Sequence, residues 1–510
     1  MKLTWILVLL MAITMTGDAQ AEALQVTVEC GKKLGKGGQI SDFLGAGGEL
    51  YPFANDPGHA VVKAWKRVGF KRITFETLHL EEDFYRWLKV TREKNGKLNI
   101  DFTDYDRYMR FYRDTLGAEP YVYLGNIPRV LSRLPKEKEH YSKYPPKDYN
   151  DWRDFCYQIV KHNVDVLGMK GLAYGVMGEP DHTIQWLPEF PRNKPTILAE
   201  YLKIWDATYR GVKEADPTAK IGGPATMNWQ LTNNTTNEET LLTLEDFIKA
   251  LAAHNQHAKP GKEIGLDYLA WQDYAWSSER IADSAEGAAG FLSKYGMNPK
   301  LPKALTGSGW GSWSTDYLNE NLQSHQRASQ IMSHMVHEFK DPARRQFWFA
   351  LYYHFLYWDS AWTKDPATAD PTQDRIALVF LRDDGSLYYS QTYAAFEMAN
   401  ILASSGGDIV STTVGEPLEV IAVCDERQTK VWAILNNHTE RDQRVEVTFH
   451  NLPMNKKPIK LGVQIIDEHH SHEGMGLMRP EWRAVEPNGQ GLIQTFTLAP
   501  YSSMLVTIVP

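Results

Sequence analysis

Short apolar runs alternate with amphipathic segments along the chain up to about residue 385. Runs at 70–75, 119–124 and 171–176 read as strands, and the apolar positions of 149–167 recur at helical spacing. Strands that alternate with helices of this length are typical of a parallel sheet. Further strands are expected at 219–222, 266–270, 303–306 and 347–353, and further helices at 102–116, 197–215 and 240–254. The pattern predicts a closed (β/α)₈ TIM barrel, provided that one more strand precedes residue 70.

The pattern changes after residue 385 to short runs of period two, without helical segments between them. Asn, Gly and Pro interrupt these runs, as they do at the turns of antiparallel sheets. Strands are expected at 418–424, 430–436, 443–449, 460–466 and 504–509. We therefore expect an α/β barrel over residues 22–385 and an accessory β-sandwich over residues 386–510.

The first 21 residues have the pattern of a secretory signal peptide. Lys2 precedes an apolar run from Leu3 to Met15, and Ala19-Gln20-Ala21 is a small-x-small cleavage site. We therefore expect a secreted or periplasmic protein. No later stretch reaches the roughly 20 apolar residues that a membrane span requires.

Composition excludes several partners. The net charge is -8, so there is no basic field to recruit nucleic acid and no polybasic stretch to bind a lipid surface. Cys30, Cys156 and Cys424 lie far apart in sequence, so the chain has no disulfide framework, although one bridge between two of them is possible. The run Asp467–Glu473 is rich in histidine but lacks the helical spacing that would direct two imidazoles at one metal. We expect no metal and no cofactor.

Glu179 is the best candidate for a catalytic acid. It follows the apolar run Tyr174-Gly-Val-Met-Gly and precedes Pro180. A glutamate at the C-terminal end of a barrel strand points into the mouth of the barrel, where enzymes of this fold carry out their chemistry.

Several motifs then follow in order and spacing that resemble glycoside hydrolase family 39, a family of β-xylosidases and related retaining glycosidases. The resemblance runs from about residue 60 to the end of the chain. It rests on Leu98-Asn-Ile-Asp-Phe-Thr-Asp-Tyr-Asp106, Pro120-Tyr-Val-Tyr-Leu-Gly-Asn-Ile-Pro128, Pro145–Trp152, Glu179-Pro180, Glu200-Tyr201, Ile221-Gly-Gly-Pro-Ala-Thr226, Ile466–His472 and Pro500–Ser503. It implies that Glu179 is the general acid/base and that the tail forms the family's accessory sandwich.

The chain departs from the family at three positions around the expected site. The family's nucleophile is the glutamate of a Thr-Glu-Trp-like segment on the seventh strand, whereas this chain has Gly307 there. Gly178 stands where an asparagine precedes the acid, and Gln272-Asp273-Tyr274 replaces a histidine-x-tyrosine on the sixth strand. The pocket that binds the cleaved sugar is therefore expected to differ.

Two hypotheses follow from these departures. In the first, the protein cleaves a glycosidic bond in a plant or algal oligo- or polysaccharide, and the second carboxylate comes from Asp273, Glu76 or Asp359. In the second, hydrolysis is lost and the barrel binds carbohydrate without cleaving it, because losing a nucleophile costs many orders of magnitude in rate. Asp273 requires care, since neighbouring strand residues face opposite sides and Asp273 would face the helix layer if Gln272 faces the pocket.

Substrate-binding candidates flank the strand ends. Sugar rings stack on aromatic planes, so the aromatic candidates are Tyr274, Trp229, Trp276, Trp310 and Trp358. Gln272, at the position of the family's histidine, is a further candidate. The sequence leaves open the sugar and linkage, exo or endo action, retention or inversion, and the oligomeric state.

Overall fold

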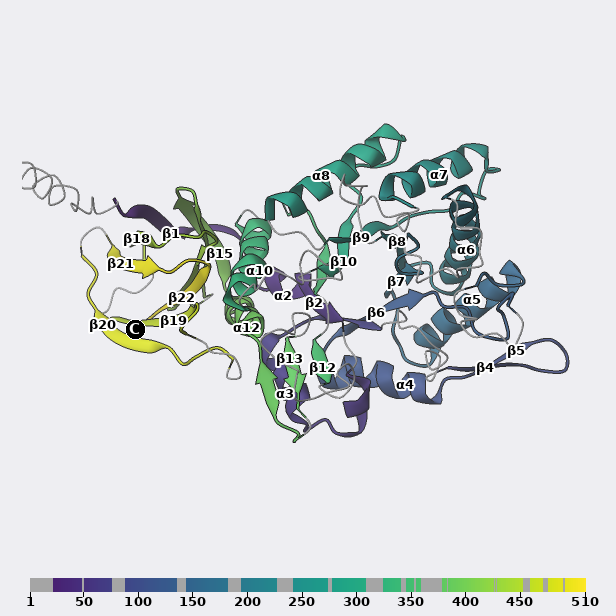
Figure 1. Ribbon diagram of the computed structural model, residues 1–510, viewed down its shortest axis with the longest axis horizontal. Helices are drawn as coiled ribbons and strands as arrows, with labels where there is room; N and C mark the ends of the chain where they lie inside the picture. Colours follow the sequence, from purple (N-terminus) through teal and green to yellow (C-terminus); the bar gives the residue numbers. More distant parts are fainter. Residues whose placement is uncertain are drawn as a thin grey trace, which may run out of the picture.

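Eight parallel strands close into a barrel, and a nine-stranded sheet lies at one end of the molecule (Figure 1). The computed structural model describes residues 22–47, 50–75, 88–134, 144–181, 194–226, 242–273, 278–308, 324–340, 345–352, 355–358, 378–382, 384–425, 427, 429–452, 459–470, 476–488 and 491–510. The predicted fold class, a TIM barrel with an accessory β-rich domain, is confirmed.

The barrel strands pair in the order β10-β11-β2-β3-β6-β7-β8-β9, with β9 closing on β10. They are β2 (Leu44–Gly47), β3 (Arg72–Phe75), β6 (Glu119–Leu124), β7 (Ala173–Val176), β8 (Lys220–Thr226), β9 (Tyr268–Asp273), β10 (Lys303–Ser308) and β11 (Phe349–Tyr352). The helices around them are α3 (Ala60–Val68), α4 (Thr103–Arg110) with the π-helical η2 (Phe111–Leu116), α5 (Tyr149–Asp165), α6 (Lys194–Ala215), α7 (Leu244–His257), α8 (Ser278–Lys294), α10 (Ser324–Phe339) and α12 (Gln391–Ala403). β2 is the strand that the sequence analysis required before residue 70.

Smaller elements complete the barrel. They are α2 (Gln39–Phe43), η1 (Tyr51–Asn55), the hairpin of β4 (Lys89–Arg92) and β5 (Leu98–Asp101), and a small sheet of β12 (Leu356–Trp358), β13 (Val379–Leu381) and β14 (Leu387–Tyr389).

Large tyrosines fill the barrel interior opposite glycines. Tyr121, Tyr123 and Tyr268 are almost fully buried there, in a cluster with small alanines from neighbouring strands. A Cβ on Gly222 would come within 2.2 Å of the Tyr268 ring, and one on Gly175 within 2.6 Å of the Tyr121 hydroxyl. The glycines therefore make room for the rings, and the interior is a packed core rather than a pore.

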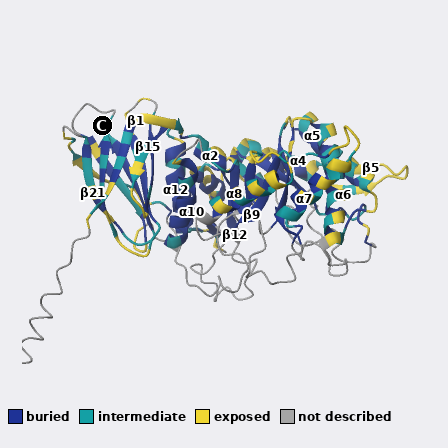
Figure 2. Cartoon of the chain, turned by 90° about the horizontal axis from the view of Figure 1, so that it is seen from above, coloured by how far each residue is buried: buried dark blue, intermediate teal, exposed yellow. Residues whose placement is uncertain are grey.

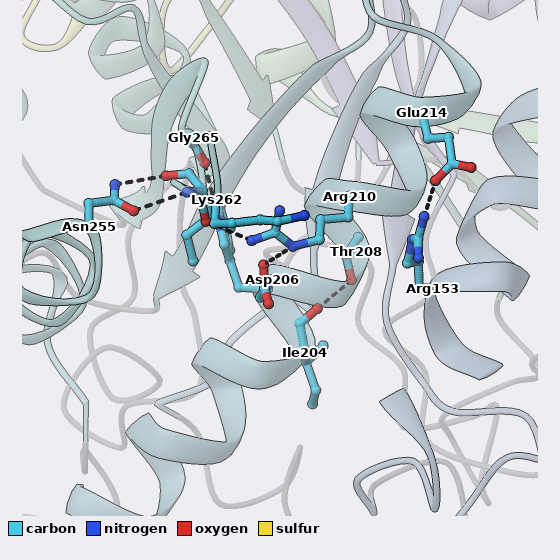
Figure 3. A network of polar contacts seen from close by, with 11 residues as sticks. Arg153, Ile204, Asp206, Thr208, Arg210, Glu214, Asn255, Lys262 and Gly265 are labelled. Atoms are coloured by element: carbon cyan, nitrogen blue, oxygen red, sulfur yellow. Dashed lines mark hydrogen bonds and ion pairs between the residues drawn. The ribbon is translucent and has the colours of Figure 1, made fainter. Parts of the chain in front are cut away.

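Polar contacts in the outer layer fix the approach to β9 (Figure 3). On α6, Arg210 pairs with Asp206 at 2.7 Å and donates to the Lys262 carbonyl at 2.7 Å. On α7, the Asn255 amide donates to the Ile264 carbonyl at 2.9 Å and accepts from its N–H at 3.0 Å. These contacts attach two helices to the segment that leads into β9.

The nine-stranded sheet curls around its own apolar core. Its order is β20-β19-β22-β17-β16-β15-β1-β18-β21, antiparallel except for the β1–β18 pair. The strands are β1 (Leu24–Lys36), β15 (Asp408–Val414), β16 (Leu418–Cys424), β17 (Val431–Asn437), β18 (Gln443–His450), β19 (Ile459–Ile466), β20 (Glu481–Val485), β21 (Leu492–Leu498) and β22 (Ser502–Val509). All five strands that the sequence analysis placed here are present within two residues.

The domain boundary differs from the expected one at both ends. β1 pairs with β15 and β18, so residues 24–36 belong to the sandwich and not to the barrel. α12 packs on α2 and α3, so the helix layer of the barrel extends to Ala403 instead of ending at 385. Most side chains of α12 are buried, and a helix buried on all sides lacks the amphipathic period that marks a helix in sequence.

A buried polar cluster joins the two domains, and α10 and α12 lie between the barrel and the sheet (Figure 1). We call this cluster the seam; it consists of Ser329, Ser333, Glu419, Asn436 and Ser503. The Asn436 amide donates to a Glu419 carboxylate oxygen at 2.7 Å and to the Ser329 carbonyl at 2.9 Å, and it accepts from the Ser329 and Ser503 hydroxyls. Ser333 donates to the other Glu419 oxygen at 2.6 Å. The domains therefore meet through a polar contact whose groups satisfy one another.

Buried positions are concentrated in the strands and between the two domains (Figure 2). Cys30, Cys156 and Cys424 are buried free thiols, so the disulfide that the sequence left possible is not formed.

Among the described helices, none combines the length and the apolar composition of a bilayer-spanning segment. The expected signal peptide, residues 1–21, lies outside the described residues.

Candidate active site

Glu179 lies just beyond the end of β7, in a sharply turned backbone. Met177 and Glu179 both have positive φ angles, 45° and 51°, which non-glycine residues rarely adopt. Such conformations cost on the order of 1–3 kcal/mol each and occur most often at functional sites. The strand therefore ends in a strained turn that presents a half-buried glutamate.

Three neighbouring elements fix this turn. The Met177 N–H donates to the Leu124 carbonyl at the end of β6, and the Glu179 N–H donates to the Ala225 carbonyl of β8, both at 3.0 Å. The Tyr201 hydroxyl, buried on α6, donates to the Val176 carbonyl at 2.8 Å. The turn from Val176 to Glu179 is thus tied to both flanking strands and to the helix that follows.

Gln272 meets Glu179 from β9. Its side chain is 1% exposed, and its Nε2 donates to Glu179 Oε1 at 2.8 Å. Ala270 belongs to the interior cluster of the barrel and Trp271 packs on Phe347 in the outer layer, so strand alternation places Gln272 on the interior side. The contact therefore directs the Glu179 carboxylate toward the inside of the mouth.

Asp273 follows Gln272 in β9, and its side chain is 4% exposed. The strand still continues at this residue, which pairs with Ser308 of β10. Alternation therefore places Asp273 on the same side as Trp271, toward the helix layer. Its catalytic role stays a prediction, and this orientation disfavours it.

Gly307 is buried on β10 in register with Gln272. A one-residue irregularity in β10, between Leu305 and Gly307, brings the glycine opposite the glutamine. Position 307 is therefore the next strand position beside the Gln272–Glu179 pair, and it carries no carboxylate.

Comparisons with known proteins agree with this geometry. Residues 55–286 match the family model for glycosyl hydrolases family 39. A β-xylosidase from Geobacillus stearothermophilus is 29% identical over 165 residues, which are 31% of this chain and 31% of that protein. The aligned stretch thus spans about a third of that relative. The predicted resemblance to glycoside hydrolase family 39 is confirmed.

Solved structures of two bacterial proteins share the fold over nearly the whole chain. A GH39 enzyme from Xanthomonas axonopodis pv. citri superposes with a TM-score of 0.71 at 14% identity, covering 98% of this chain and 100% of that one. A monomeric β-xylosidase from Caulobacter crescentus CB15 gives a TM-score of 0.69 at 15% identity, covering 96% and 100%. The barrel and the sandwich are therefore both shared, while identities this low establish the fold alone.

Several of the predicted site residues fall outside the described residues. These are Glu76, Asp359, Tyr274, Trp229, Trp276 and Trp310. Trp358 is the last residue of β12, next to the barrel strands in sequence. The roles of all these residues stay predictions.

Sequence reasoning missed two features of the site. Gln272 was expected to bind substrate, whereas the structure shows it in contact with Glu179; the signal was that β7 and β9 flank the same strand, β8. Asp181, two residues after Glu179, is 2% exposed. Burial raises the pKa of Tyr201, and the charges of Tyr123 and Asp181 raise it further.

Metal-binding geometry is absent from the described part of the chain, where no three His, Cys, Asp or Glu side chains are grouped to hold an ion. Within the histidine-rich run after β19, the described residues Asp467–His470 form a tight turn. Asp467 accepts the backbone N–H groups of His469 and His470 at 2.7 Å, and these hydrogen bonds lower its pKa against the effect of burial. Gln391, at the start of α12, donates to the Asp467 carbonyl at 2.7 Å, so this sandwich loop reaches the barrel.

Proposed function

We propose that the chain is a secreted glycoside hydrolase that cleaves a glycosidic bond in a plant or algal oligo- or polysaccharide, with Glu179 as general acid/base. The position of Glu179 carries the proposal. A half-buried carboxyl beyond a barrel strand, tied by its backbone to β8 and by its side chain to Gln272, is held where a substrate can reach it. Proton transfer requires such a group within about 2.6–3.2 Å of the leaving oxygen.

A glycosidase of this kind needs a second carboxyl group. One about 5–5.5 Å from the acid attacks the anomeric carbon and retains configuration, whereas one about 6.5–9.5 Å away activates water and inverts it. Gly307 supplies none, so the second group must come from elsewhere in the mouth. The remaining candidates are Glu76, which follows the barrel strand β3, and Asp359, which follows β12 of the small sheet, while the orientation of Asp273 disfavours it.

A second candidate function is carbohydrate binding without cleavage. The specific observation in its favour is Gly307, since a glycine beside the Gln272–Glu179 pair leaves room for a sugar but gives no nucleophile. Aromatic side chains around the strand ends would serve as stacking platforms in either function.

The decisive experiment compares two isosteric changes. Wild type, Glu179→Gln and Glu419→Gln are incubated with aryl β-D-xylosides, other aryl glycosides, and oligosaccharides from plant and algal polysaccharides. Glu419 is a matched control because it also accepts a hydrogen bond from a buried amide, but in the seam. We expect product from wild type and Glu419→Gln, and a loss of about 10²–10⁴-fold in Glu179→Gln on substrates with poor leaving groups.

Other results would decide against hydrolysis or against Glu179. Binding of an oligosaccharide by calorimetry with no product from any of the three proteins would favour the binding function. Equal activity in wild type and Glu179→Gln would remove Glu179 from the mechanism. Export is tested separately, by N-terminal sequencing of the protein from the culture medium or periplasm, where the mature chain is expected to begin near Glu22.

A further inference from the structure

The surroundings of Gln272 restrict the movement of its side chain. It lies within β9, which pairs with β8 on one side and β10 on the other, and its side chain is almost fully buried. Its amide therefore has little freedom to turn away from Glu179. The amide donates its hydrogen bond to Oε1 of Glu179.

The backbone contacts of Glu179 do not fix its carboxylate. The N–H bond to Ala225 sets the position of the main chain, but three side-chain torsions remain between the backbone and the carboxylate oxygens. A hydrogen bond to Oε1 restricts these torsions and gives Oε2 a defined direction in the mouth. A misplacement of about 1 Å can cost on the order of 10²-fold in rate, so this restriction has a direct catalytic consequence.

The chemistry of an amide suits this task. Its N–H group donates to the carboxylate in the ionised form, yet it neither carries a charge nor exchanges a proton with the acid near neutral pH. A lysine or arginine in its place would form an ion pair and oppose protonation of Glu179. Gly307, in register with Gln272, adds no side chain that would compete for the amide.

We propose that Gln272 is a positioning residue that aligns the Glu179 carboxylate for proton transfer to the glycosidic oxygen. The inference rests on the proposed hydrolase function and deepens it. Glu179 hands its proton to the departing oxygen as the bond to the anomeric carbon breaks, and Gln272 acts only through the direction of that carboxyl group.

Leaving-group dependence separates this role from a structural one. The test uses the sugar that wild type hydrolyses fastest, as its phenyl and 2,4-dinitrophenyl glycosides. Phenolate requires a proton to leave, whereas dinitrophenolate leaves without one. We expect Gln272→Leu to lower kcat/KM about 10–100-fold on the phenyl glycoside and less than about threefold on the dinitrophenyl glycoside.

Two further variants sharpen the test. Gln272→His retains a donor, and we expect it to recover the phenyl glycoside activity to within about fivefold of wild type. Asn436→Leu, a change in the seam, is the control for lost stability and is expected to affect both substrates equally. Equal losses on the two glycosides in Gln272→Leu, or no loss on either, would overturn the inference.

The contact itself is tested without any assay of activity. Thermal unfolding of Gln272→Leu, Glu179→Leu and the double variant forms a cycle, in which we expect the Tm shifts to deviate from additivity by about 2 °C or more. Additive shifts would show that the two side chains are not coupled and would also overturn the inference. If wild type cleaves no glycoside, the hydrolase function fails and catalytic positioning fails with it, while the cycle still reports whether the pair exists.

Discussion

The mouth of the barrel and the seam between the domains each contain an amide that donates to a carboxylate. Gln272 donates to Glu179 at 2.8 Å in the mouth, and Asn436 donates to Glu419 at 2.7 Å in the seam. Both amides are buried and both carboxylates are half-buried. The two pairs are thus nearly identical as isolated contacts.

Their surroundings differ. In the seam, Ser329, Ser333 and Ser503 complete the hydrogen bonds of Asn436 and Glu419, and α10 covers the pair. In the mouth, the pair lies at the strand ends beside a glycine, and the backbone of the acid is strained. A satisfied network under a helix stabilises one packing arrangement, whereas a strained pair at an open rim is suited to chemistry. The contact alone therefore does not identify a site.

Disrupting the seam should have the largest effect on stability. Asn436→Leu removes a donor from the half-buried Glu419 carboxylate and from the Ser329 carbonyl, and it removes the acceptor of the buried Ser503 hydroxyl, so we expect a loss of about 2–4 kcal/mol in the free energy of unfolding. Urea denaturation measures this loss, and kcat/KM should stay within about twofold of wild type at temperatures where the variant is folded. A stable variant with reduced turnover would mean that the seam communicates with the mouth.

A second prediction concerns the pH dependence of stability. It involves Glu338 near the end of α10, which belongs to neither pair. Burial raises the pKa of Glu338, near the end of α10, to about 7, against the backbone N–H groups of Gln346 and Phe347 that lower it. A carboxyl whose pKa is raised in the folded state contributes stability that is fully present below its unfolded pKa of 4.5. This contribution is lost as pH rises toward and through 7.

Glu338→Gln should remove this dependence. We expect wild type to lose roughly 1–3 kcal/mol more than the variant in the free energy of unfolding between pH 4.5 and 8. Burial lowers the pKa of His334 to about 3, so this residue destabilises the fold as pH falls below 6.5. Because His334 is present in both proteins, the difference between their urea midpoints isolates Glu338. Parallel pH profiles would show that Glu338 does not titrate in this range.

A substitution at Gly307 tests directly how the mouth differs from the seam. Gly307→Glu places a carboxylate beside the Gln272–Glu179 pair, where it competes for the amide and occupies the space left for the sugar. If the enzyme already uses another second carboxylate, kcat/KM should fall about tenfold or more. A rise in kcat/KM on the same aryl glycosides would instead show that the natural mouth lacks its nucleophile, which supports the carbohydrate-binding function.

The architecture was readable from sequence because each barrel unit repeats the same pattern. The strand at 119–124 was predicted with the bounds that β6 has, and the strand before residue 70 was inferred from the count alone. The failures have two different causes. α12 is buried at most positions and has no polar face to reveal its period, whereas the place of β1 depends on pairing with β15 and β18, which lie near the other end of the chain.

The site was less predictable because it depends on distances between strands. Glu179 was recognisable from the apolar run and the proline around it, and strand alternation already indicated that Asp273 and Gln272 face opposite sides. The contact between Gln272 and Glu179 could not be predicted from the sequence, since the two residues are 93 positions apart and meet across β8. Nothing in the local sequence marks the bulge that sets Gly307 beside Gln272.

The smallest expected effect tests the hydrogen bond by which Tyr201 supports the end of β7, next to Glu179. Tyr201→Phe removes the donor to the Val176 carbonyl, the last residue of β7. Because a carbonyl has two lone pairs and tolerates partial satisfaction, we expect a loss of only about 1 kcal/mol in the free energy of unfolding. A slightly looser turn at Glu179 should lower kcat/KM about two- to fivefold. Tyr209→Phe on the same helix is the matched control, since its hydroxyl contacts Gly265 in the outer layer, away from β7, and should affect stability alone. Equal kcat/KM values in the two variants would mean that α6 stabilises the barrel without contributing to the placement of the acid, and that the strained turn after Val176 is sufficient to hold Glu179.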